Sequence, residues 1–329
     1  MSLPSFEVVR PQSLDRALEA LAHYGANAQM VAGGTDLIPS MKQGLFAPRV
    51  LLDLKGLRDL DFIRFDPDGG LEIGALTRIT PLAESAVVAR HFPVLREAAK
   101  TIASPLLRNM GTLGGNLCLD TRCLYYNQSG FWRESLGYCI KKDGTRCHVA
   151  PGSAICWAVF SGDTAPALLA LDATVELASP RGRRSVALHD FYVNDGLVRM
   201  NKAHDEIVTA VRVPAANAGW LGVYKKLRIR QSIDYPLAGV AVALKKDRDG
   251  TCLDARLALT AVNPAPRLVP ATERLRGRRY DLALVDEVAH EAIRTAKPLR
   301  TSASTMEYRR HMVRVFVRRA LGELWRNGE

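Results

Sequence analysis

The 329-residue chain contains no long run of apolar residues. None approaches the roughly 18–20 consecutive apolar residues that a helix needs to cross a bilayer. Its first residues, MSLPSFEVVR, also lack the basic segment followed by an apolar stretch that marks a secretory signal. We therefore expect a cytoplasmic protein, in which structural disulfides are rare because glutathione keeps thiols reduced.

Neither of the two glycine turns of the chain contains a common nucleotide-binding motif. The first turn, VAGGTDL (residues 31–37), follows an apolar strand-like run, and the second is TLGGN (residues 112–116). Neither has the G-x-G-x-x-G spacing of a Rossmann site or the Lys-Ser/Thr that ends a Walker A loop. Each alone is typical of a tight turn, although glycines also let backbone N–H groups face an oxyanion. Two such turns in one chain would suit a ligand with a pyrophosphate and a long polar tail, such as FAD.

Aromatic side chains are not interleaved with the basic residues, which argues against a nucleic-acid module. The net charge is +11, and from residue 221 onward there are 22 Lys and Arg against 12 Asp and Glu. A basic end suits nucleic acid, an acidic protein partner or an anionic cofactor. Its last stretch, MEYRRHMVRVFVRRALGELW, is typical of an amphipathic helix. We expect Tyr308, Met312, Phe316 and Leu324 on its apolar side, and Arg309, Arg310, Arg314, Arg318 and Arg319 on a solvated side.

Cysteine is nearly absent outside one segment, where five of the six cysteines follow the second glycine turn. Their spacing, C-x4-C-x15-C-x7-C-x8-C over residues 118–156, offers only one pair close enough for a zinc knuckle. Four thiolates from one irregular loop are the usual ligands of an iron–sulfur cluster. The residues alone leave three alternatives open: an iron–sulfur cluster, a zinc site, or unligated redox thiols. Basic residues near the cysteines would balance the negative charge of a cluster: Arg122, Lys141, Lys142 and Arg146. Aromatic residues would shield it from solvent: Tyr125, Tyr126, Phe131, Trp132 and Trp157.

Apolar patterns divide the chain into three parts. Residues 1–55 predict the order β-α-β-α-β, with a helix at SLDRALEALAHYG. Residues 56–215 form a second α/β unit with strand candidates at LEIGA and ATVELAS and a helix at FPVLREAAKTIAS. The cysteine-rich segment interrupts this unit at about residues 119–158. In residues 216–329 strand-like runs precede helical ones, which predicts a smaller α+β domain.

Four stretches, in the same order, resemble the FAD-binding subunit of the xanthine oxidase (molybdenum hydroxylase) family. They are VAGGTDLIPSMKQG, ASPLLRNMGTLGGNLC, GDTAPALLALDA and YKKLRIRQSIDYPLAGVAVAL. The resemblance covers essentially the whole chain. It implies an α+β protein, in which two α/β subdomains of the PCMH type clasp FAD. A C-terminal α+β domain like that of the carbon monoxide dehydrogenase flavoprotein would follow.

The resemblance also implies which residues bind FAD. The first turn would hold the pyrophosphate and ribityl chain, and the second turn would form another clamp. Asp163 would accept hydrogen bonds from polar groups of the flavin, and Lys226 would lie near the isoalloxazine. The alternative for Asp163 is a helix N-terminal residue. The remaining implied FAD-binding residues are Val31, Ala32, Gly33, Gly34, Thr35, Asp36, Leu37, Ile102, Thr112, Leu113, Gly114, Gly115 and Asn116.

Most members of the family lack the cysteine-rich segment. Its sequence, CLDTRCLYYNQSGFWRESLGYCIKKDGTRCHV and AICW, resembles an insertion in the β subunits of 4-hydroxybenzoyl-CoA reductases, which carries an additional [4Fe–4S] cluster. The match implies four ligands: Cys123, Cys139, Cys147 and Cys156. Cys118 belongs to the second glycine turn and is expected to be a small buried residue, and Cys252 is expected to be unligated.

The resemblance implies a function in electron transfer. The chain would join a molybdopterin-binding large subunit and a small subunit with [2Fe–2S] clusters, as a doubled heterotrimer. Electrons from ferredoxin would pass through the [4Fe–4S] cluster and FAD to molybdenum, where 4-hydroxybenzoyl-CoA loses its hydroxyl. The substrate would bind the partner, so no catalytic acid or base is expected here, and neither nucleic acid nor membrane is an expected partner. Alternatives are the flavin subunit of an ordinary molybdenum hydroxylase, a reductase for another aryl-CoA, a zinc-stapled binding protein, and a basic nucleic-acid binder.

Overall fold

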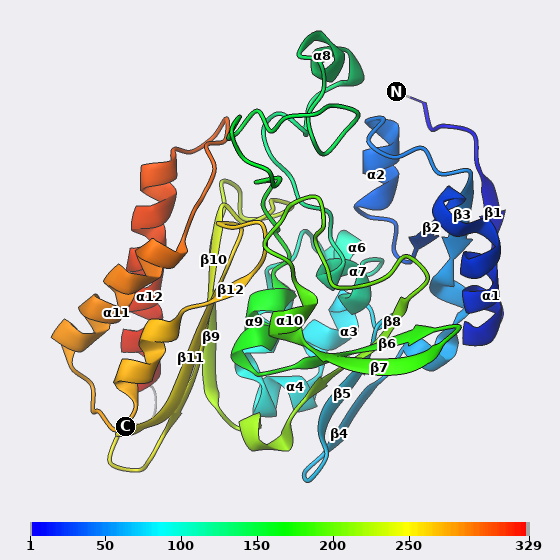
Figure 1. Ribbon diagram of the computed structural model, residues 1–329. Coiled ribbons are helices and arrows are strands. Elements are labelled where there is room, and N and C mark those ends of the chain that lie inside the picture. The colour runs from blue at the N-terminus through cyan, green and yellow to red at the C-terminus, as the bar shows by residue number, and fades with distance from the viewer. Residues whose placement is uncertain (1, 327–329) are drawn as a thin grey trace.

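The structure is a computed structural model that describes residues 2–326 (Figure 1). These residues form three sheets with helices packed between and outside them. Within them, no helix combines the length and apolar character needed to cross a membrane. Short 3-10 segments connect the larger elements at Gly25–Asn27, Leu54–Gly56, Arg58–Leu60, Ala215–Asn217 and Pro270–Leu275.

A parallel three-stranded sheet, in the order β1-β3-β2, organises the N-terminal part. Helix α1 begins after Ser13, whose side chain accepts a hydrogen bond from the Arg16 N–H, and ends at Gly25 with a φ of +51°. The predicted order β-α-β-α-β is confirmed. The elements are β1 (Glu7–Val9), α1 (Leu14–Tyr24), β2 (Ala28–Val31), α2 (Leu37–Lys42) and β3 (Val50–Asp53).

An antiparallel five-stranded sheet, in the order β4-β5-β8-β6-β7, organises the middle part. Its predicted strands and helix are present as β5, β6 and α5. Every residue of α9 is buried, because this helix packs against α5 and against a second sheet on its other side. The elements are β4 (Ile63–Asp66), β5 (Gly70–Gly74), α3 (Ile79–Glu84), α4 (Ala86–His91), α5 (Pro93–Lys100), α6 (Pro105–Arg108), α7 (Leu113–Leu117), α9 (Thr164–Ala170), β6 (Thr174–Ser179), β7 (Gly182–Ala187), α10 (Leu188–Phe191) and β8 (Ile207–Val213).

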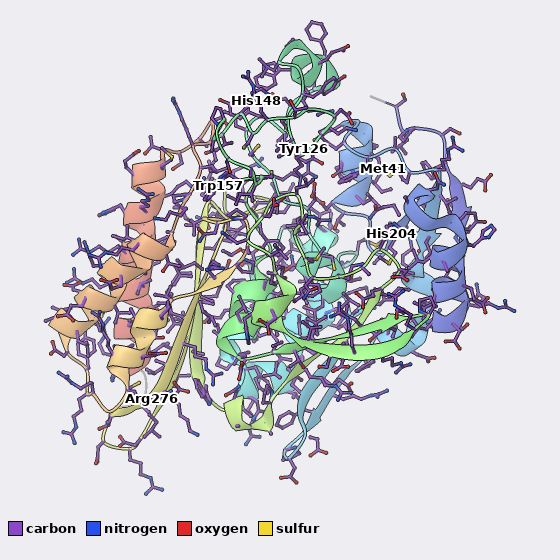
Figure 2. The ribbon with its side chains drawn as sticks, in the orientation of Figure 1. Met41, Tyr126, His148, Trp157, His204 and Arg276 are labelled. Atoms are coloured by element: carbon purple, nitrogen blue, oxygen red, sulfur yellow. The ribbon has the colours of Figure 1, made fainter. Side chains whose placement is uncertain are left out.

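The cysteine-rich segment interrupts the middle part between α7 and α9, as the sequence predicts. Its one α-helix is the short α8 (Gly130–Ser135), which projects above the rest of the molecule (Figure 1). Tyr126 and His148 lie below that helix, and Trp157 lies where the segment rejoins the middle part (Figure 2). Tyr126 is buried, but Phe131 is 83% exposed. Phe131 therefore does not shield the cysteines, contrary to the prediction.

The C-terminal part is an antiparallel sheet, in the order β12-β11-β10-β9, with two helices on its outer face. Side chains of β10 alternate as a two-sided strand requires. Val240 and Val242 face α11 and α12, whereas Ala241 and Ala243 join the core of the middle part. The elements are β9 (Leu221–Leu227), β10 (Ala238–Lys246), β11 (Cys252–Thr260), β12 (Arg267–Leu268), α11 (Leu282–Thr295) and α12 (Met306–Arg326).

The face predicted for the last helix is confirmed at Leu324, which is buried, and is wrong at Tyr308 and Arg309. Tyr308 is 51% exposed, whereas Arg309, predicted to be solvated, is 1% exposed. The buried stripe of α12 runs instead through Val313, Val317 and Leu321. Arg309 fits at its start because its guanidinium donates hydrogen bonds to three main-chain carbonyls.

Arg309 ties together three segments that are distant in sequence. Its Nε donates to the carbonyl of Leu237 at 2.7 Å, and its two terminal nitrogens donate to the carbonyls of Leu299 and Ala261. No carboxylate of residues 2–326 is bonded to it, and burial lowers the pKa of Arg309 to about 10. The side chain therefore acts as a donor for backbone groups that would otherwise be buried without partners.

Replacement of Arg309 tests this role. Arg309→Met would leave three buried carbonyls without donors, so we expect a loss of about 3 kcal/mol or more in the free energy of unfolding. Urea unfolding of the purified chain would measure it. Arg319→Met, on the same helix but at an exposed position, is the matched control and should change stability by less than about 0.5 kcal/mol. Equal effects of the two substitutions would contradict this account.

Candidate functional site

The two glycine turns contact each other through their backbones. A Cβ atom at position 33 would lie 2.1 Å from the carbonyl oxygen of Met110 and 2.9 Å from the Cα of Gly111. Only glycine fits at such a distance. Gly34 has a φ of +69°, which glycine adopts without strain. The first turn is thereby pressed against the segment that leads into the second.

The second turn is held by its own helix start. Thr112 precedes α7, and its hydroxyl accepts a hydrogen bond from the N–H of Gly115 at 3.1 Å. A Cβ atom on Gly114 would lie 2.9 Å from both the carbonyl oxygen and the Cβ of Ala75. This glycine therefore lets α7 pack directly against the chain that follows β5.

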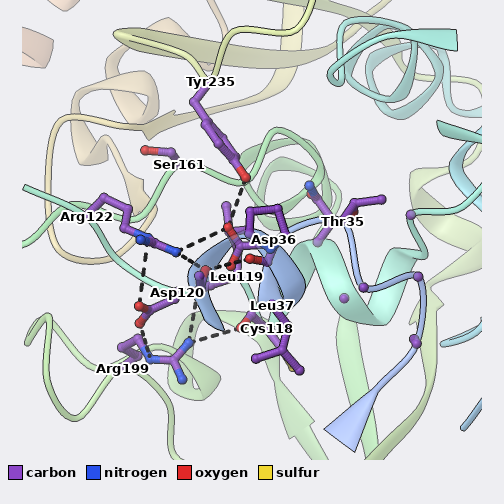
Figure 3. Close-up of a pocket in the computed structure, with 18 of the residues that line it drawn as sticks. Thr35, Asp36, Leu37, Cys118, Leu119, Asp120, Arg122, Ser161, Arg199 and Tyr235 are labelled. Carbon is purple, nitrogen blue, oxygen red and sulfur yellow. Dashed lines mark hydrogen bonds and ion pairs between the residues drawn. The ribbon is translucent and has the colours of Figure 1, made fainter. Parts of the chain in front are cut away.

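A cavity of about 1070 Å³ opens beside the two turns. Its volume matches the upper end of the range for cofactor pockets. Residues of all three parts of the chain line it, and the cysteine-rich segment contributes as well. Figure 3 shows part of this wall, where Thr35, Asp36 and Leu37 lie opposite Arg122 and Tyr235.

Most residues implied by the resemblance line this cavity. They are Val31, Ala32, Gly33, Gly34, Thr35, Asp36, Leu37, Ile102, Thr112, Gly114, Gly115, Asn116 and Asp163. Leu113 and Lys226 do not: Leu113 is fully buried in the middle core, and Lys226 lies behind Asp163 as its ion-pair partner. The glycines at the cavity wall, which leave room for a ligand and expose backbone N–H groups, fit a bound FAD.

Asp163 is tied to the C-terminal sheet. Its Oδ1 accepts a hydrogen bond from the Tyr224 hydroxyl at 2.7 Å, and its Oδ2 accepts one from Lys226 Nζ at 3.0 Å. Burial raises the pKa of Asp163, and the charge of Lys226 opposes that shift. Asp163 stands at the start of α9 but does not cap it; the side chain of Asn116 accepts from the Thr164 N–H instead.

The contacts that Arg122 makes with Asp36 and Asp120 at the cavity wall were not predicted from the sequence. Arg122 lies 3.5 Å from a carboxylate oxygen of Asp36, and the Tyr235 hydroxyl donates to the same carboxylate at 3.1 Å. Burial raises the pKa of Asp36, and the charge of Arg122 opposes that shift. Arg122 also approaches Asp120, which pairs with Arg199 at 3.4 Å (Figure 3). Sequence patterns gave no signal for these contacts, because they join residues that are distant along the chain.

The four predicted cysteine ligands lie close to one another. Cys139, Cys147 and Cys156 are buried, and Cys123 is partly buried at the cavity wall. Burial raises the pKa of Cys156 to about 11, and nearby Cys123 and Cys147 add to that shift. Backbone N–H groups donate to two of the sulfurs, Tyr126 N to Cys123 at 3.3 Å and Ala158 N to Cys156 at 3.4 Å.

These thiols are neighbours without being arranged as metal ligands. Across residues 2–326, no group of three or more His, Cys, Asp or Glu side chains has a geometry that would hold a metal ion. The other two cysteines lie elsewhere: Cys118 lines the cavity, and Cys252 is buried at the start of β11. All six cysteines are free thiols.

The contact between the turns can be tested by adding one methyl group. Gly33→Ala would force the two turns apart, and overpacking of this kind costs about 1–3 kcal/mol. We expect FAD affinity to fall about tenfold or more, measured by flavin fluorescence titration. Gly152→Ala is the control, because a Cβ atom there meets nothing within 4 Å. Wild-type affinity in Gly33→Ala would show that the contact does not shape the site.

Comparisons with known proteins agree with this geometry. Residues 4–216 match the FAD binding domain in molybdopterin dehydrogenase, and residues 222–324 match the CO dehydrogenase flavoprotein C-terminal domain. The chain is 31% identical to the carbon monoxide dehydrogenase medium chain of Hydrogenophaga pseudoflava, over 98% of both chains. It is 37% identical to the aldehyde oxidoreductase FAD-binding subunit PaoB of Escherichia coli, over 75% of this chain and 78% of that one.

The fold is shared with solved structures. The reconstituted CO dehydrogenase from Oligotropha carboxidovorans superposes with a TM-score of 0.82 at 30% identity, over 99% of both chains. These findings confirm the predicted fold and an oxidoreductase subunit that binds FAD. The chain belongs to the FAD-binding medium subunits of the molybdenum hydroxylase family.

Proposed function

We propose that this chain carries both FAD and a [4Fe–4S] cluster and transfers electrons between them. The observation that supports the proposal is the gathering of Cys123, Cys139, Cys147 and Cys156 beside the FAD cavity, with Cys123 in its wall. Four cysteine thiolates are the usual ligand set of such a cluster. Because a metal site and its loop form together, cluster binding would draw the four sulfurs into a ligand geometry.

The names of the relatives support a proposal about the partner subunits. Several are named as medium chains or FAD-binding subunits. We propose a complex with a molybdopterin-binding large subunit and a [2Fe–2S] small subunit, doubled to two copies of each chain. When bound, FAD would accept single electrons from the [4Fe–4S] cluster and pass single electrons on to the [2Fe–2S] clusters. The residues of this chain would bind and orient the cofactors, and the substrate would bind the large subunit.

For the reaction, we propose the reductive dehydroxylation of 4-hydroxybenzoyl-CoA to benzoyl-CoA, with ferredoxin as electron donor. The cysteine-rich segment supports this choice, because it resembles the insertion of that reductase family. The basic C-terminal part would attract an acidic ferredoxin or a partner subunit. The second candidate is a hydroxylase acting on an aldehyde, CO or a purine, and the names of the relatives favour it.

Metal analysis of the full chain, produced without its partners, tests the cluster. We expect about four iron atoms and four acid-labile sulfides per chain. Cys139→Ser and Cys147→Ser should lose the iron and keep FAD, because neither residue lines the cavity. Cys252→Ser is the matched control and should retain both. Zinc in place of iron, or iron that survives both ligand substitutions, would refute the cluster.

The substrate is tested on the purified complex. We expect reduced ferredoxin to be oxidised when 4-hydroxybenzoyl-CoA is added, with benzoyl-CoA as product and a rate that falls as salt is added. The same preparation should not oxidise aldehydes, CO or xanthine at a comparable rate. Oxidation of one of these without aryl-CoA reduction would assign the complex to the second candidate.

A further inference from the structure

Two surface segments at the edge of the FAD cavity expose large apolar side chains. Leu106 on α6 is 80% exposed, and Ile229 and Ile233, in the loop that follows β9, are 66% and 50% exposed. Ile233 also lines the cavity, as do Ile102 and Ala103 just before α6. Single exposed apolar residues are common, but several that gather in one place mark an interaction surface.

Hydrogen bonds join the two segments. Arg228 Nη1 donates to the carbonyl of Thr101 at 3.3 Å. The N–H of Ile233 donates to the carbonyl of Ala103 at 2.8 Å, and the Ser232 hydroxyl donates to the same carbonyl at 3.4 Å. The exposed apolar side chains therefore lie on one surface, one side of which is the cavity wall. We call this surface the rim patch, and it consists of Leu106, Ile229 and Ile233.

The backbone beneath the rim patch is strained. Ala103 has a φ of +43° and Ile233 has a φ of +70°, and neither residue is a glycine. A β-branched residue rarely adopts this left-handed conformation, because it costs energy. Strained residues of this kind are typical of functional sites. Here the strained backbone holds an isoleucine half exposed at the edge of the cavity.

Positive charge adjoins the rim patch. Arg108 Nη1 donates to the carbonyl of Ile102 at 2.8 Å, next to the Thr101 carbonyl that Arg228 contacts. Within residues 2–326, no carboxylate lies within ion-pair distance of either arginine. Burial lowers the pKa of Arg108, the charge of Arg228 lowers it further, and the charge of Glu84 opposes these shifts only in part. Two neighbouring cations without a counter-ion favour a partner that supplies carboxylates.

We propose that the rim patch is the docking surface for the [2Fe–2S] small subunit, and that this subunit presents an apolar face bordered by carboxylates. The inference rests on the complex proposed above. In that complex the small subunit carries the clusters that exchange electrons with FAD, so it has to lie beside the FAD cavity. The rim patch meets this condition because Ile233 belongs both to the patch and to the cavity wall. Carboxylates of the small subunit would pair with Arg108 and Arg228.

The complex of the three subunits, purified through a tag on this chain, tests the surface. Leu106→Glu places a negative charge in the rim patch, so we expect the small subunit retained per chain to fall about tenfold or more. Ile229→Glu should have the same effect. Phe131→Glu is the matched control, because Phe131 is an 83% exposed apolar residue of another short helix. It should retain the small subunit within about twofold of wild type.

A flavin fluorescence titration of the chain alone separates docking from folding. Neither Leu106 nor Ile229 lines the cavity, so both variants should bind FAD within about twofold of wild type. Retention of the small subunit by the wild-type chain should fall as salt is added, because salt screens exposed charge pairs.

Several results would overturn the proposal. One is wild-type retention of the small subunit by both Leu106→Glu and Ile229→Glu, and another is an equal loss in Phe131→Glu. Loss of the large subunit alone would assign the rim patch to that subunit instead. Retention that does not depend on salt would contradict the acidic face of the small subunit. A wild-type chain that retains no small subunit would refute the proposed complex itself, on which the inference rests.

Discussion

The structure depends on the backbone contact between Gly33 and Met110. This contact joins the parallel sheet of the first part to the helix-rich middle part at a distance that no side chain would allow. Helix α2 begins at Leu37, the last residue of the first turn, and α7 (Leu113–Leu117) includes the glycines of the second. The contact therefore lies beside both helix starts. The cavity for FAD is the space that remains beside it.

The C-terminal part shares an apolar core with the middle part, and it also reaches this cavity through polar side chains. Lys226 and Tyr224 on β9 reach Asp163 at the start of α9, and Tyr235 reaches Asp36 in the first turn. A buried ion pair is weak evidence for stability, because desolvation offsets much of its attraction, but breaking one partner is strongly destabilising. These contacts therefore fix the C-terminal part in one orientation against the cofactor site more than they strengthen the fold.

The sequence predicted the features that depend on local rules. The first glycine turn, the Ser13 and Gly25 helix boundaries and the buried strands follow from residue type and spacing, whereas the second glycine stretch forms the short helix α7. It failed where a contact in space overrides a local pattern. The residue pattern predicts a solvated Arg309, but its side chain is buried because it donates hydrogen bonds to three distant main-chain carbonyls. The resemblance places Lys226 near the isoalloxazine; in the structure its ammonium is bonded to Asp163, a residue of the cavity wall. A family resemblance predicts which residues lie near the cofactor, whereas the contacts of each side chain depend on the three-dimensional structure.

The cysteine-rich segment has little apolar core of its own, so its place depends on charged side chains that reach into the rest of the molecule. Arg133 of α8 is buried and donates to the carbonyls of Gln43 and Gly44, 3.2 Å away, just after α2. Arg122 reaches Asp36, at the other end of the same helix. The segment is thus anchored at both ends of α2, the helix that begins at the first FAD turn. A shift of the segment would strain that helix, and movement of the turn would pull on the segment. The same short helix therefore fixes the position of the four thiols relative to the FAD cavity.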